Sequence, residues 1–231
     1  MKYVRKFFRL ILKLVLWFFV ITIGLTVVYK FVPVPLTPLM LIRLAEQATD
    51  SEKSLKLYKD WVSIDKISKH APQAVFASED QKFMDHNGFD IEEMKKVWES
   101  NKTGKKIRGA STISQQTAKN VFLWPGRNLV RKGLEAYFTV LIEFIWGKER
   151  IMTVYLNVIE MGEGIYGIEA AAQHNFNKPA EKLSRNEAAL IAAVLPNPRR
   201  WSPARPTPYI LGRQVWILRQ MNNLKQLEMG V

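Results

Sequence analysis

Adjacent carboxylates at Glu79 and Asp80 are the first residues in this sequence that could do chemistry. Apolar residues stand four and three positions before Glu79 and four positions after it, at Val75, Phe76 and Phe83. If the segment is helical, these side chains share a face with Glu79. A carboxylate held against apolar side chains loses solvation of its charged form and accepts a proton more readily near neutral pH. Glu79 is therefore the candidate general base, and a solvated helix face is the alternative that this segment leaves open.

A second candidate carboxylate, Glu135, stands beside two cations. Arg131 and Lys132 precede it by four and three residues, and an apolar helical stripe that includes Leu134 and Phe138 runs past it. Residues four apart on a helix often pair on the surface, where such ion pairs contribute little. The other interpretation is a carboxylate that stays charged close to a phosphate or a metal ion. The sequence around Glu135 leaves both open.

A basic, glycine-containing segment at residues 101–110 leads directly into a predicted helix start. Thr112 and Gln115 match a capping box, which places the first turn of that helix near Ser111. The free N–H groups of a helix start attract anions, and Arg108 adds a cation beside them. A flexible basic loop before an ordinary helix is the alternative. Further donors for phosphate or sugar hydroxyls follow at Gln115, Gln116 and Lys119.

The N-terminal residues predict a membrane anchor that precedes the domain carrying these motifs. Residues 1–13 are basic, and an uncharged run follows them. The run is short for a membrane span, but the lysines on either side can snorkel to the membrane surface, so we expect a membrane helix at 14–32. The run lacks a small-x-small site, so an uncleaved anchor is favoured over a signal peptide. Residues 33–40 form a proline-containing linker, and 41–231 form the catalytic domain. The basic residues favour the cytoplasmic side for the N-terminus.

The composition limits the chemistry that is available. The 231 residues contain no cysteine, which excludes disulfides, thiolate chemistry and cysteine zinc sites. Three histidines, scattered along the chain, make a histidine metal site unfavourable. A net charge of +13 predicts an anionic partner, which could be nucleic acid, phospholipid or a phosphorylated substrate.

The elements that must position the candidate residues are mostly helical in pattern. We expect a helix through Glu79 that is closed by the turn at residues 87–88, and another helix at residues 149–157. Ser184 and Glu187 predict a further capped helix. Together with the stripe around Glu135, these patterns indicate a mainly α domain.

Residues 162–167 formally match a dinucleotide-binding glycine fingerprint. A Rossmann site needs alternating strands and helices, whereas the surrounding pattern is helical. We therefore interpret the segment as a tight loop between helices. A last helix is expected from about residue 209 to the C-terminus.

Taken together, these motifs resemble the peptidoglycan glycosyltransferase family, and in particular its membrane-anchored monofunctional members. The matching residues are Glu79 to Phe83 with His86 and Gly88; residues 109–120; Arg131, Lys132 and Glu135; Lys148, Ile151 and residues 155–157; and residues 162–167, Ala171, Ala172, Phe176, Leu183, Glu187, Ala188 and Pro196. They occur in the family's order and with similar gaps, which overrides the surface-pair and loop alternatives. Ala110, Thr153 and Asn175 depart from the glycine, glutamate and tyrosine usual there.

The resemblance implies a mainly α, lysozyme-like fold with a mobile segment over the cleft. It also implies an enzyme that polymerises lipid II into β-1,4 glycan strands with inversion, releasing polyprenyl diphosphate. By position, Glu79 rather than Asp80 resembles the base that deprotonates the acceptor's 4-hydroxyl, and Glu135 resembles the second essential carboxylate. The resemblance places the following residues at the substrate: Asp80, Phe83, His86, Arg108, Ser111, Thr112, Gln115, Gln116, Lys119, Asn120, Arg131 and Lys132.

The resemblance also implies a cofactor, partners and a location. A divalent cation, Mg²⁺ or Mn²⁺, is expected by resemblance only, and its ligands are not identified. The expected partners are lipid II, the growing glycan strand, the phospholipid membrane and other cell-wall synthesis or division proteins, without nucleic acid. We expect a single-pass protein of the bacterial cytoplasmic (inner) membrane, with its N-terminus inside, its catalytic domain on the periplasmic face, and no transpeptidase domain.

Two other functions stay open from the residues themselves. A lysozyme-like glycan-cleaving enzyme also uses carboxylates, although the basic helix start and the pair Arg131 and Lys132 favour a diphosphate over a neutral glycan. A non-catalytic membrane scaffold would use the positive charge to bind anionic lipid. The first would shorten preformed glycan, and the second would not need Glu79.

Overall fold

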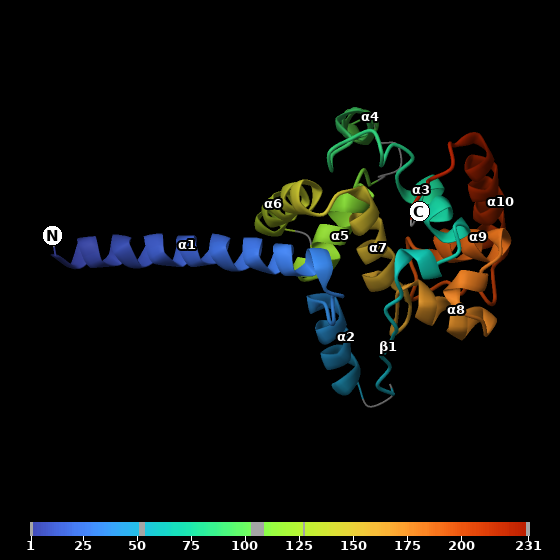
Figure 1. Cartoon of the computed structure of the whole chain (residues 1–231), viewed down its shortest axis with the longest axis horizontal. Coiled ribbons are helices and arrows are strands. Elements are labelled where there is room, and N and C mark those ends of the chain that lie inside the picture. The colour runs from blue at the N-terminus through green and yellow to red at the C-terminus, as the bar shows by residue number, and fades with distance from the viewer. Residues whose placement is uncertain (1, 51–53, 103–108, 127, 230–231) are drawn as a thin grey trace.

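The structure is a computed structural model of the chain, and it describes residues 2–50, 54–102, 109–126 and 128–229 (Figure 1). Helices dominate these residues, and the strands are short. The elements are α1 (Lys2–Phe31), α2 (Pro38–Ala48), β1 (Tyr58–Lys59), η1 (Ile64–Lys66), α3 (His70–Glu79), α4 (Ile91–Lys102), α5 (Ile113–Phe122), α6 (Leu129–Ile145), α7 (Lys148–Val158), β2 (Glu160–Gly162), β3 (Ile165–Tyr166), α8 (Ile168–Phe176), η2 (Ala180–Lys182), α9 (Arg185–Val194) and α10 (Pro208–Asn223). The mainly α prediction is confirmed.

Helix α1 projects from the body of the molecule over most of its length (Figure 1). Within the described residues, Tyr3–Phe31 is the one stretch of helix long and apolar enough to cross a membrane. The predicted membrane helix at 14–32 is part of a longer helix, since the basic residues before it are also helical. Helix α2 begins at Pro38, after its N-cap Thr37, so it starts inside the predicted linker.

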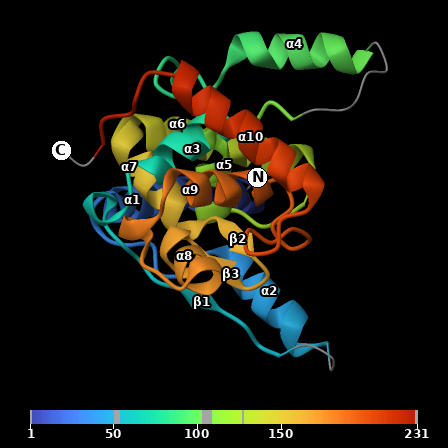
Figure 2. The same cartoon turned by 90° about the vertical axis from the view of Figure 1, so that its right-hand side faces the viewer.

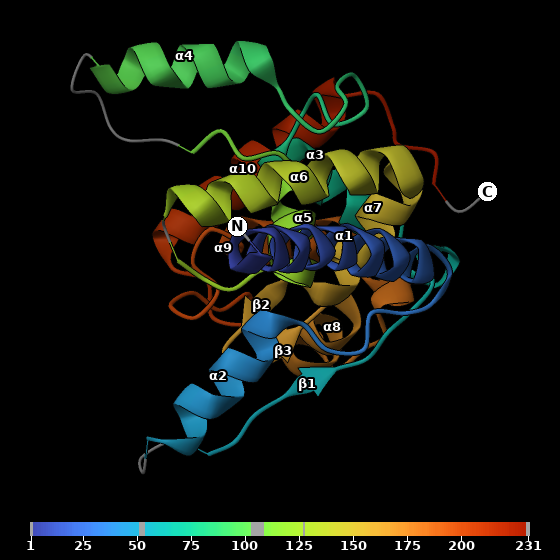
Figure 3. The ribbon, with the colours of Figure 1, turned by 90° about the vertical axis from the view of Figure 1, so that its left-hand side faces the viewer.

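The last turns of α1 are held against α6 and α7, and Figure 3 shows α1 lying beside α6. The hydroxyls of Thr22 and Tyr137 are hydrogen-bonded at 2.7 Å. The indole N–H of Trp146 donates to the Thr26 carbonyl at 2.7 Å, and the Arg150 guanidinium donates to carbonyls at the end of α1. The Arg150 guanidinium thus satisfies a backbone acceptor in the last turn, where a helix end otherwise leaves carbonyls unpaired. The anchor is thus joined to the domain by specific contacts.

Two groups of helices form the core of the domain. Helix α3 packs against α9 and α10, and α5 packs against α6 and α7. In Figure 2, α10 crosses in front of α3 and α9. Small side chains on the buried face of α9, such as Ala189 and Ala192, allow this close packing. Larger buried side chains, including Ile113 and Tyr155, fill the space around α5 and α7.

A small sheet lies at the edge of the helical core, with strand order β1-β3-β2. Strand β1 pairs in parallel with β3, and β2 pairs with β3 in an antiparallel hairpin. The predicted loop at 162–167 is therefore the turn and second strand of this hairpin, followed by the N-cap of α8. Sequence periodicity missed these strands because each is only two or three residues long.

The structure corrects two predicted helix ends. Helix α3 stops at Glu79, before the turn at residues 87–88, because Asp80 is a C-cap with non-helical geometry. Helix α10 ends at Asn223, and the next residues are extended so that Leu227 is buried in the core. Helix α4, which follows the turn, lies apart from the other helices in all three views (Figures 1, 2 and 3).

Candidate active site

The first carboxylate, Glu79, is half-buried at the end of α3, on the wall of a cavity. Gln116 Nε2 donates to Glu79 Oε2 at 3.0 Å, and Ser78 Oγ donates to Oε1 at 3.2 Å. Both donors are neutral, and Glu79 forms no ion pair with any residue that the structure describes. No cation therefore pairs directly with this carboxylate, an arrangement that suits a general base.

The predicted helix face around Glu79 is only partly correct. Val75 and Phe76 are buried in α3, as expected. Phe83 is also fully buried, but it lies beyond the end of the helix and does not share a helical face with Glu79. The apolar surroundings come from the core that the chain enters after it turns at Asp80.

Asp80 joins the end of α3 to the start of α5. Its carboxylate accepts the backbone N–H of Ile113 at 3.1 Å and lies 3.1 Å from His86 Nε2. The Gly88 N–H donates to His86 Nδ1, so Nε2 carries the ring proton and donates to Asp80. Asp80 and His86 thus fix the position of Glu79 relative to the helix that begins at Ile113.

The predicted capping box at the start of α5 is confirmed. Thr112 Oγ1 accepts the N–H of Gln115, and Gln115 Oε1 accepts the N–H of Thr112 at 3.0 Å. The Thr112 hydroxyl also donates to the Gly88 carbonyl at 2.6 Å. Because both side chains are buried, they act here by shaping the helix start that a bound anion would meet.

Gln116 connects Glu79 to the buried core through Tyr155. Gln116 Oε1 accepts a hydrogen bond from the Tyr155 hydroxyl at 3.2 Å. Burial, with the charges of Glu79 and Asp80, raises the pKa of Tyr155 well above its ordinary value. The hydroxyl therefore stays protonated and donates, which turns the NH₂ group of Gln116 toward Glu79.

A partly buried ion pair supports this wall of the cavity. Lys148 Nζ donates to Glu143 at 2.7 Å and to the His86 carbonyl at 2.5 Å, and it lies 4.6 Å from the centre of the Phe83 ring. Ser114 Oγ donates to the same Glu143 carboxylate. Phe83 is enclosed beneath the cavity, so a substrate contact for it stays a prediction.

The second carboxylate, Glu135, is buried in α6 and is held by two cations. Arg131 Nη1 lies 2.7 Å from Glu135 Oε2, and Lys132 Nζ lies 2.5 Å from Oε1. Glu135 is only 3% exposed, so the surface-pair interpretation does not describe it. Removing one member of such a buried pair leaves an uncompensated charge. In contrast to Glu79, Glu135 serves as the counter-ion of a cationic cluster.

Lys119 of α5 adds a third cation to this cluster. Burial lowers the pKa of Lys119 below its ordinary value; Glu135 opposes the shift, and Arg131 and Lys132 reinforce it. Lys119 forms no ion pair with the described residues, so its ammonium group is available to an anion in the cavity that it lines. Three cations around one carboxylate leave a net positive charge, which suits a diphosphate.

Two neighbouring cavities meet at the start of α5. The Glu79 cavity has a volume of about 450 Å³, and the Glu135 cavity has a volume of about 510 Å³. Gly109 and Ser111 line both cavities. Two reactants, one in each cavity, would therefore meet at this shared edge. On one side lies Glu79, whose hydrogen-bond donors are neutral, and on the other lies the cationic cluster around Glu135.

The structure brings most of the predicted site residues to these two cavities. Those that line one or the other are Glu79, Asp80, Ser111, Thr112, Lys119, Asn120, Arg131, Lys132 and Glu135. Gln115 lines a smaller neighbouring hollow, and Gln116 reaches the site through its bond to Glu79. Arg108 lies outside the described residues.

Some residues that line the cavities were not predicted as site residues. Arg43 and Leu39 of α2 line the Glu135 cavity together with Trp124, and Lys82 and Trp216 line the Glu79 cavity. The sequence around Arg43 does not indicate its position beside the cleft. Packing of α2 and α10 against distant segments creates these contacts, and no local sequence signal encodes them.

Comparison with known proteins identifies a family for the part of the chain that carries both carboxylates. A family model described as transglycosylase matches residues 47–222. The match begins inside α2 and ends inside α10, so it includes both carboxylates and most of the residues that line the two cavities.

Individual relatives extend the similarity over nearly the whole chain. A protein of Bacteroides thetaiotaomicron named biosynthetic peptidoglycan transglycosylase is 55% identical over 219 residues, which are 95% of this chain and 88% of the relative. A protein of Bdellovibrio bacteriovorus with the same name is 55% identical over 91% of this chain and 84% of its own length. A third, from Pseudomonas fluorescens, is 50% identical over 95% of this chain and 91% of its own length.

Proposed function

Because this chain belongs to the transglycosylase family of peptidoglycan synthesis, we propose that Glu79 and Glu135 serve the two reactants of glycosyl transfer. The family assignment makes the chain an enzyme that polymerises glycan strands, with lipid II and the growing strand as its substrates. The finer proposal concerns the residues. One observation carries it: two cavities, each with its own carboxylate, share Gly109 and Ser111 at one edge.

The acceptor occupies the Glu79 cavity. Its sugar hydroxyl must approach a carboxylate that can take a proton, and Glu79 has neutral donors on both oxygens. The bond from Gln116 holds the carboxylate in place without cancelling its charge. Asp80 and His86 act as positioning residues, because they fix the end of α3 against the start of α5.

The donor diphosphate occupies the Glu135 cavity. Lys119, Arg131 and Lys132 face this cavity and supply the charge that a diphosphate requires. The same cations stabilise the negative charge that develops on the leaving group. Glu135 keeps Arg131 and Lys132 in place through their ion pairs, so its effect on the reaction passes through these cations.

The reaction balances with these groups alone. The acceptor hydroxyl gives its proton to Glu79, and its oxygen forms a new bond to the anomeric carbon of the donor. The bond from that carbon to the diphosphate breaks, and polyprenyl diphosphate leaves with the electron pair. Inversion, which the family resemblance implies, requires the acceptor oxygen to attack the face of that carbon opposite to the diphosphate.

A divalent cation stays a prediction that the described side chains do not support. Both oxygens of Glu135 already face cations, at 2.7 and 2.5 Å. Across residues 2–50, 54–102, 109–126 and 128–229, no three acidic, histidine or cysteine side chains gather in a way that could hold a metal ion. The residues therefore do not fit such an ion by themselves, and the steps above do not use one.

We place the catalytic domain on the outer side of the cytoplasmic membrane. Helix α1 supports anchoring by its length and composition. The five basic residues in positions 1–13 favour the cytoplasm for the N-terminus, which puts the rest of the chain across the membrane. Binding of other cell-wall synthesis or division proteins is part of the same proposal and needs a pull-down from native membranes to test it.

The substitution Glu79→Gln tests the assignment of the base. It keeps the size of the side chain but removes the proton acceptor, so polymerisation of purified lipid II should fall at least about 100-fold. Binding of a non-transferable donor analogue should stay close to wild type, because the Glu135 cavity is unchanged. The matched control is Glu181→Gln, which alters an exposed carboxylate on η2 and should leave the rate unchanged.

The result also separates the alternative functions. Undiminished polymerisation by Glu79→Gln would contradict the role of Glu79 as base. Shortening of preformed glycan by the wild-type protein would favour a glycan-cleaving enzyme. Release of polyprenyl diphosphate together with lengthening of the glycan supports the transfer reaction.

A further inference from the structure

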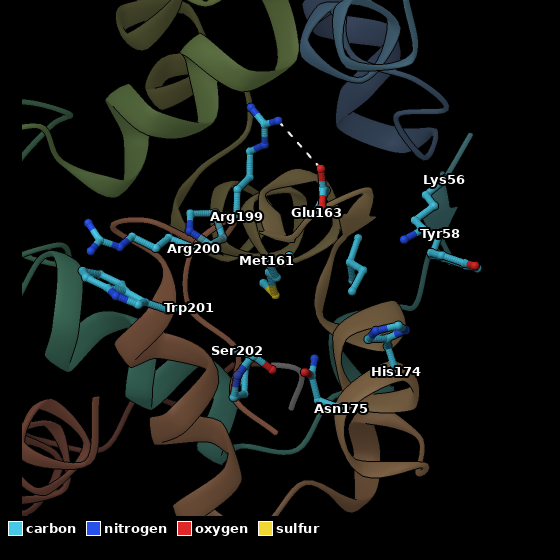
Figure 4. A pocket seen from close by; sticks show the side chains of 14 residues that line it. Lys56, Tyr58, Met161, Glu163, His174, Asn175, Arg199, Arg200, Trp201 and Ser202 are labelled. Carbon is cyan, nitrogen blue, oxygen red and sulfur yellow. Dashed lines mark ion pairs between the residues drawn. The ribbon is translucent and has the colours of Figure 1, made fainter. Parts of the chain in front are cut away.

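A third cavity, with a volume of about 440 Å³, has no part in the reaction described above. Its walls come from the segment around β1, the hairpin β2–β3, the end of α8 and residues 198–203 (Figure 4). We call it the strand-side cavity. Segments far apart in the sequence build it, so its chemistry has to be judged from the side chains that it gathers.

Aromatic rings stand on two sides of the strand-side cavity. Figure 4 shows Tyr58 near His174 on one flank and Trp201 on the opposite flank. The Tyr58 and His174 rings lie 5.9 Å apart, and Tyr58 is 50% exposed. An exposed aromatic face offers a flat apolar surface, which matches the C–H face of a sugar ring. This arrangement suits an oligosaccharide.

Cations outnumber acids in the same cavity. Lys56, Arg199 and Arg200 line it, against the single carboxylate of Glu163. Arg199 and Glu163 approach each other only to 3.9 Å, and both side chains are more than one-third exposed. Such a loose pair leaves the guanidinium free to bind another carboxylate. The ligand that fits the walls is therefore an oligosaccharide that carries carboxylate groups.

The glycine-rich segment at 162–167 builds one wall of this cavity. Gly164 has φ +73°, and a Cβ there would lie 2.6 Å from the Lys56 carbonyl oxygen. The Gly164 carbonyl accepts the N–H of Tyr58 at 2.8 Å. Glycine is needed because the backbone before β1 crosses directly over the hairpin. The motif that matches a nucleotide fingerprint thus serves to bring Lys56 and Tyr58 to the cavity.

Strand β2 connects the strand-side cavity to the Glu135 cavity. Glu160, the first residue of β2, lies 3.9 Å from Arg43 of α2, which lines the Glu135 cavity. The next residues of the same strand, Met161 and Gly162, line the strand-side cavity. One short strand therefore separates the two spaces. The strand-side cavity therefore lies beside the Arg43 wall of the Glu135 cavity, within reach of a glycan that extends past Arg43.

We propose that the strand-side cavity binds the already polymerised part of the donor glycan, through sugar rings on Tyr58 and peptide-stem carboxylates on Lys56. This inference rests on the proposed function, because it takes the Glu135 cavity as the place of the donor diphosphate. New sugars join at the diphosphate end of the donor, so the older sugars must extend away from it. The cavity holds them and keeps the strand on the enzyme between additions.

Two donors with blocked 4-hydroxyls test the proposal, one with a single disaccharide and one with several. Coupling to lipid II is measured as kcat/KM with the full-length protein in detergent. Lys56→Ala and Tyr58→Ala should each lower kcat/KM for the long donor about threefold to fivefold, the effect of one exposed contact. The same variants should use the short donor at the wild-type rate. Lys66→Ala, another exposed lysine, is the matched control for Lys56→Ala and should change neither.

A long donor without peptide stems separates the two contacts. The effect of Lys56→Ala should disappear with this donor, whereas the effect of Tyr58→Ala should persist. Equal losses on short and long donors, or no loss on either, would overturn the proposal. If the wild-type protein couples neither donor, the proposed function itself fails, which is a different result. The helical circular dichroism signal of each variant checks that the variant is folded. If Tyr58→Ala does not fold, the result with Lys56→Ala alone decides whether the proposal holds.

Discussion

Replacing Tyr155 with phenylalanine removes one hydroxyl from the core and leaves every carbon atom of the ring in place. That hydroxyl is fully buried and donates to Gln116 Oε1 at 3.2 Å. Loss of one such hydrogen bond lowers the free energy of unfolding by about 1 kcal/mol. It also removes the donor that fixes the amide of Gln116, so the NH₂ group is held less firmly against Glu79.

The kinetic consequence should be confined to the chemical step. Without an oriented donor on Oε2, Glu79 is held less well, and kcat should fall about fivefold, which corresponds to about 1 kcal/mol in the activation free energy. The KM for donor and acceptor should change little, because Tyr155 contacts neither cavity directly. Continuous measurement of lipid II consumption at several substrate concentrations separates the two parameters.

Tyr166→Phe is the matched control. Tyr166 is also buried, but its hydroxyl has no hydrogen-bond partner among the described residues. Removing a buried, unpaired hydroxyl should leave the free energy of unfolding unchanged or raise it by about 1 kcal/mol. Wild-type kcat in Tyr155→Phe, or an equal loss in both variants, would refute the reasoning that links Tyr155 to Glu79 through Gln116.

Two further predictions follow from pKa and from backbone geometry. Burial lowers the pKa of Lys119, so its ammonium group should lose its proton as pH rises through a value below the pKa of an ordinary lysine, and the enzyme should then bind the donor more weakly. Lys119→Arg should move this loss of donor affinity to higher pH. Identical dependence of the donor KM on pH in the wild-type and variant proteins would contradict the prediction. Gly164→Ala should lower the free energy of unfolding by about 1–3 kcal/mol, because φ is +73° and an added Cβ would collide with the Lys56 backbone. Gly212→Ala is the control: Gly212 is exposed in α10, and a Cβ there would have nothing within 4 Å, so the free energy of unfolding should rise by up to about 1 kcal/mol. Thermal melting measures both effects.

Local signals in the sequence predicted the helix starts well. The capping boxes at Thr112 and Ser184 are both present, because a cap depends on residues only three positions apart. The cationic cluster was also predicted as a candidate, since Arg131 and Glu135 lie one turn apart on the same helix. Such features need no knowledge of the rest of the fold.

Features that depend on packing were not predictable in this way. The burial of Glu135 decides between a surface pair and a cationic cluster, and it results from packing of α6 against α5. Arg43 reaches the Glu135 cavity only because α2 packs against α5. The end of α3 at Glu79 depends on Asp80 binding the start of α5, which is a contact between residues 33 positions apart.

The docking of α1 fixes more than the position of the chain's first helix. Arg150 bonds to carbonyls at and just past its end, Trp146 bonds to the carbonyl of Thr26, and Tyr137 bonds to Thr22 one turn further back. A helix tethered by a loose linker would let the domain tumble above the lipid surface, whereas these contacts resist rotation about the junction. Under the anchoring that we propose for α1, the two cavities keep a constant height and tilt relative to the membrane. Substrates that diffuse within the membrane would then meet the cleft in one orientation, and the search for them would be reduced from three dimensions to two.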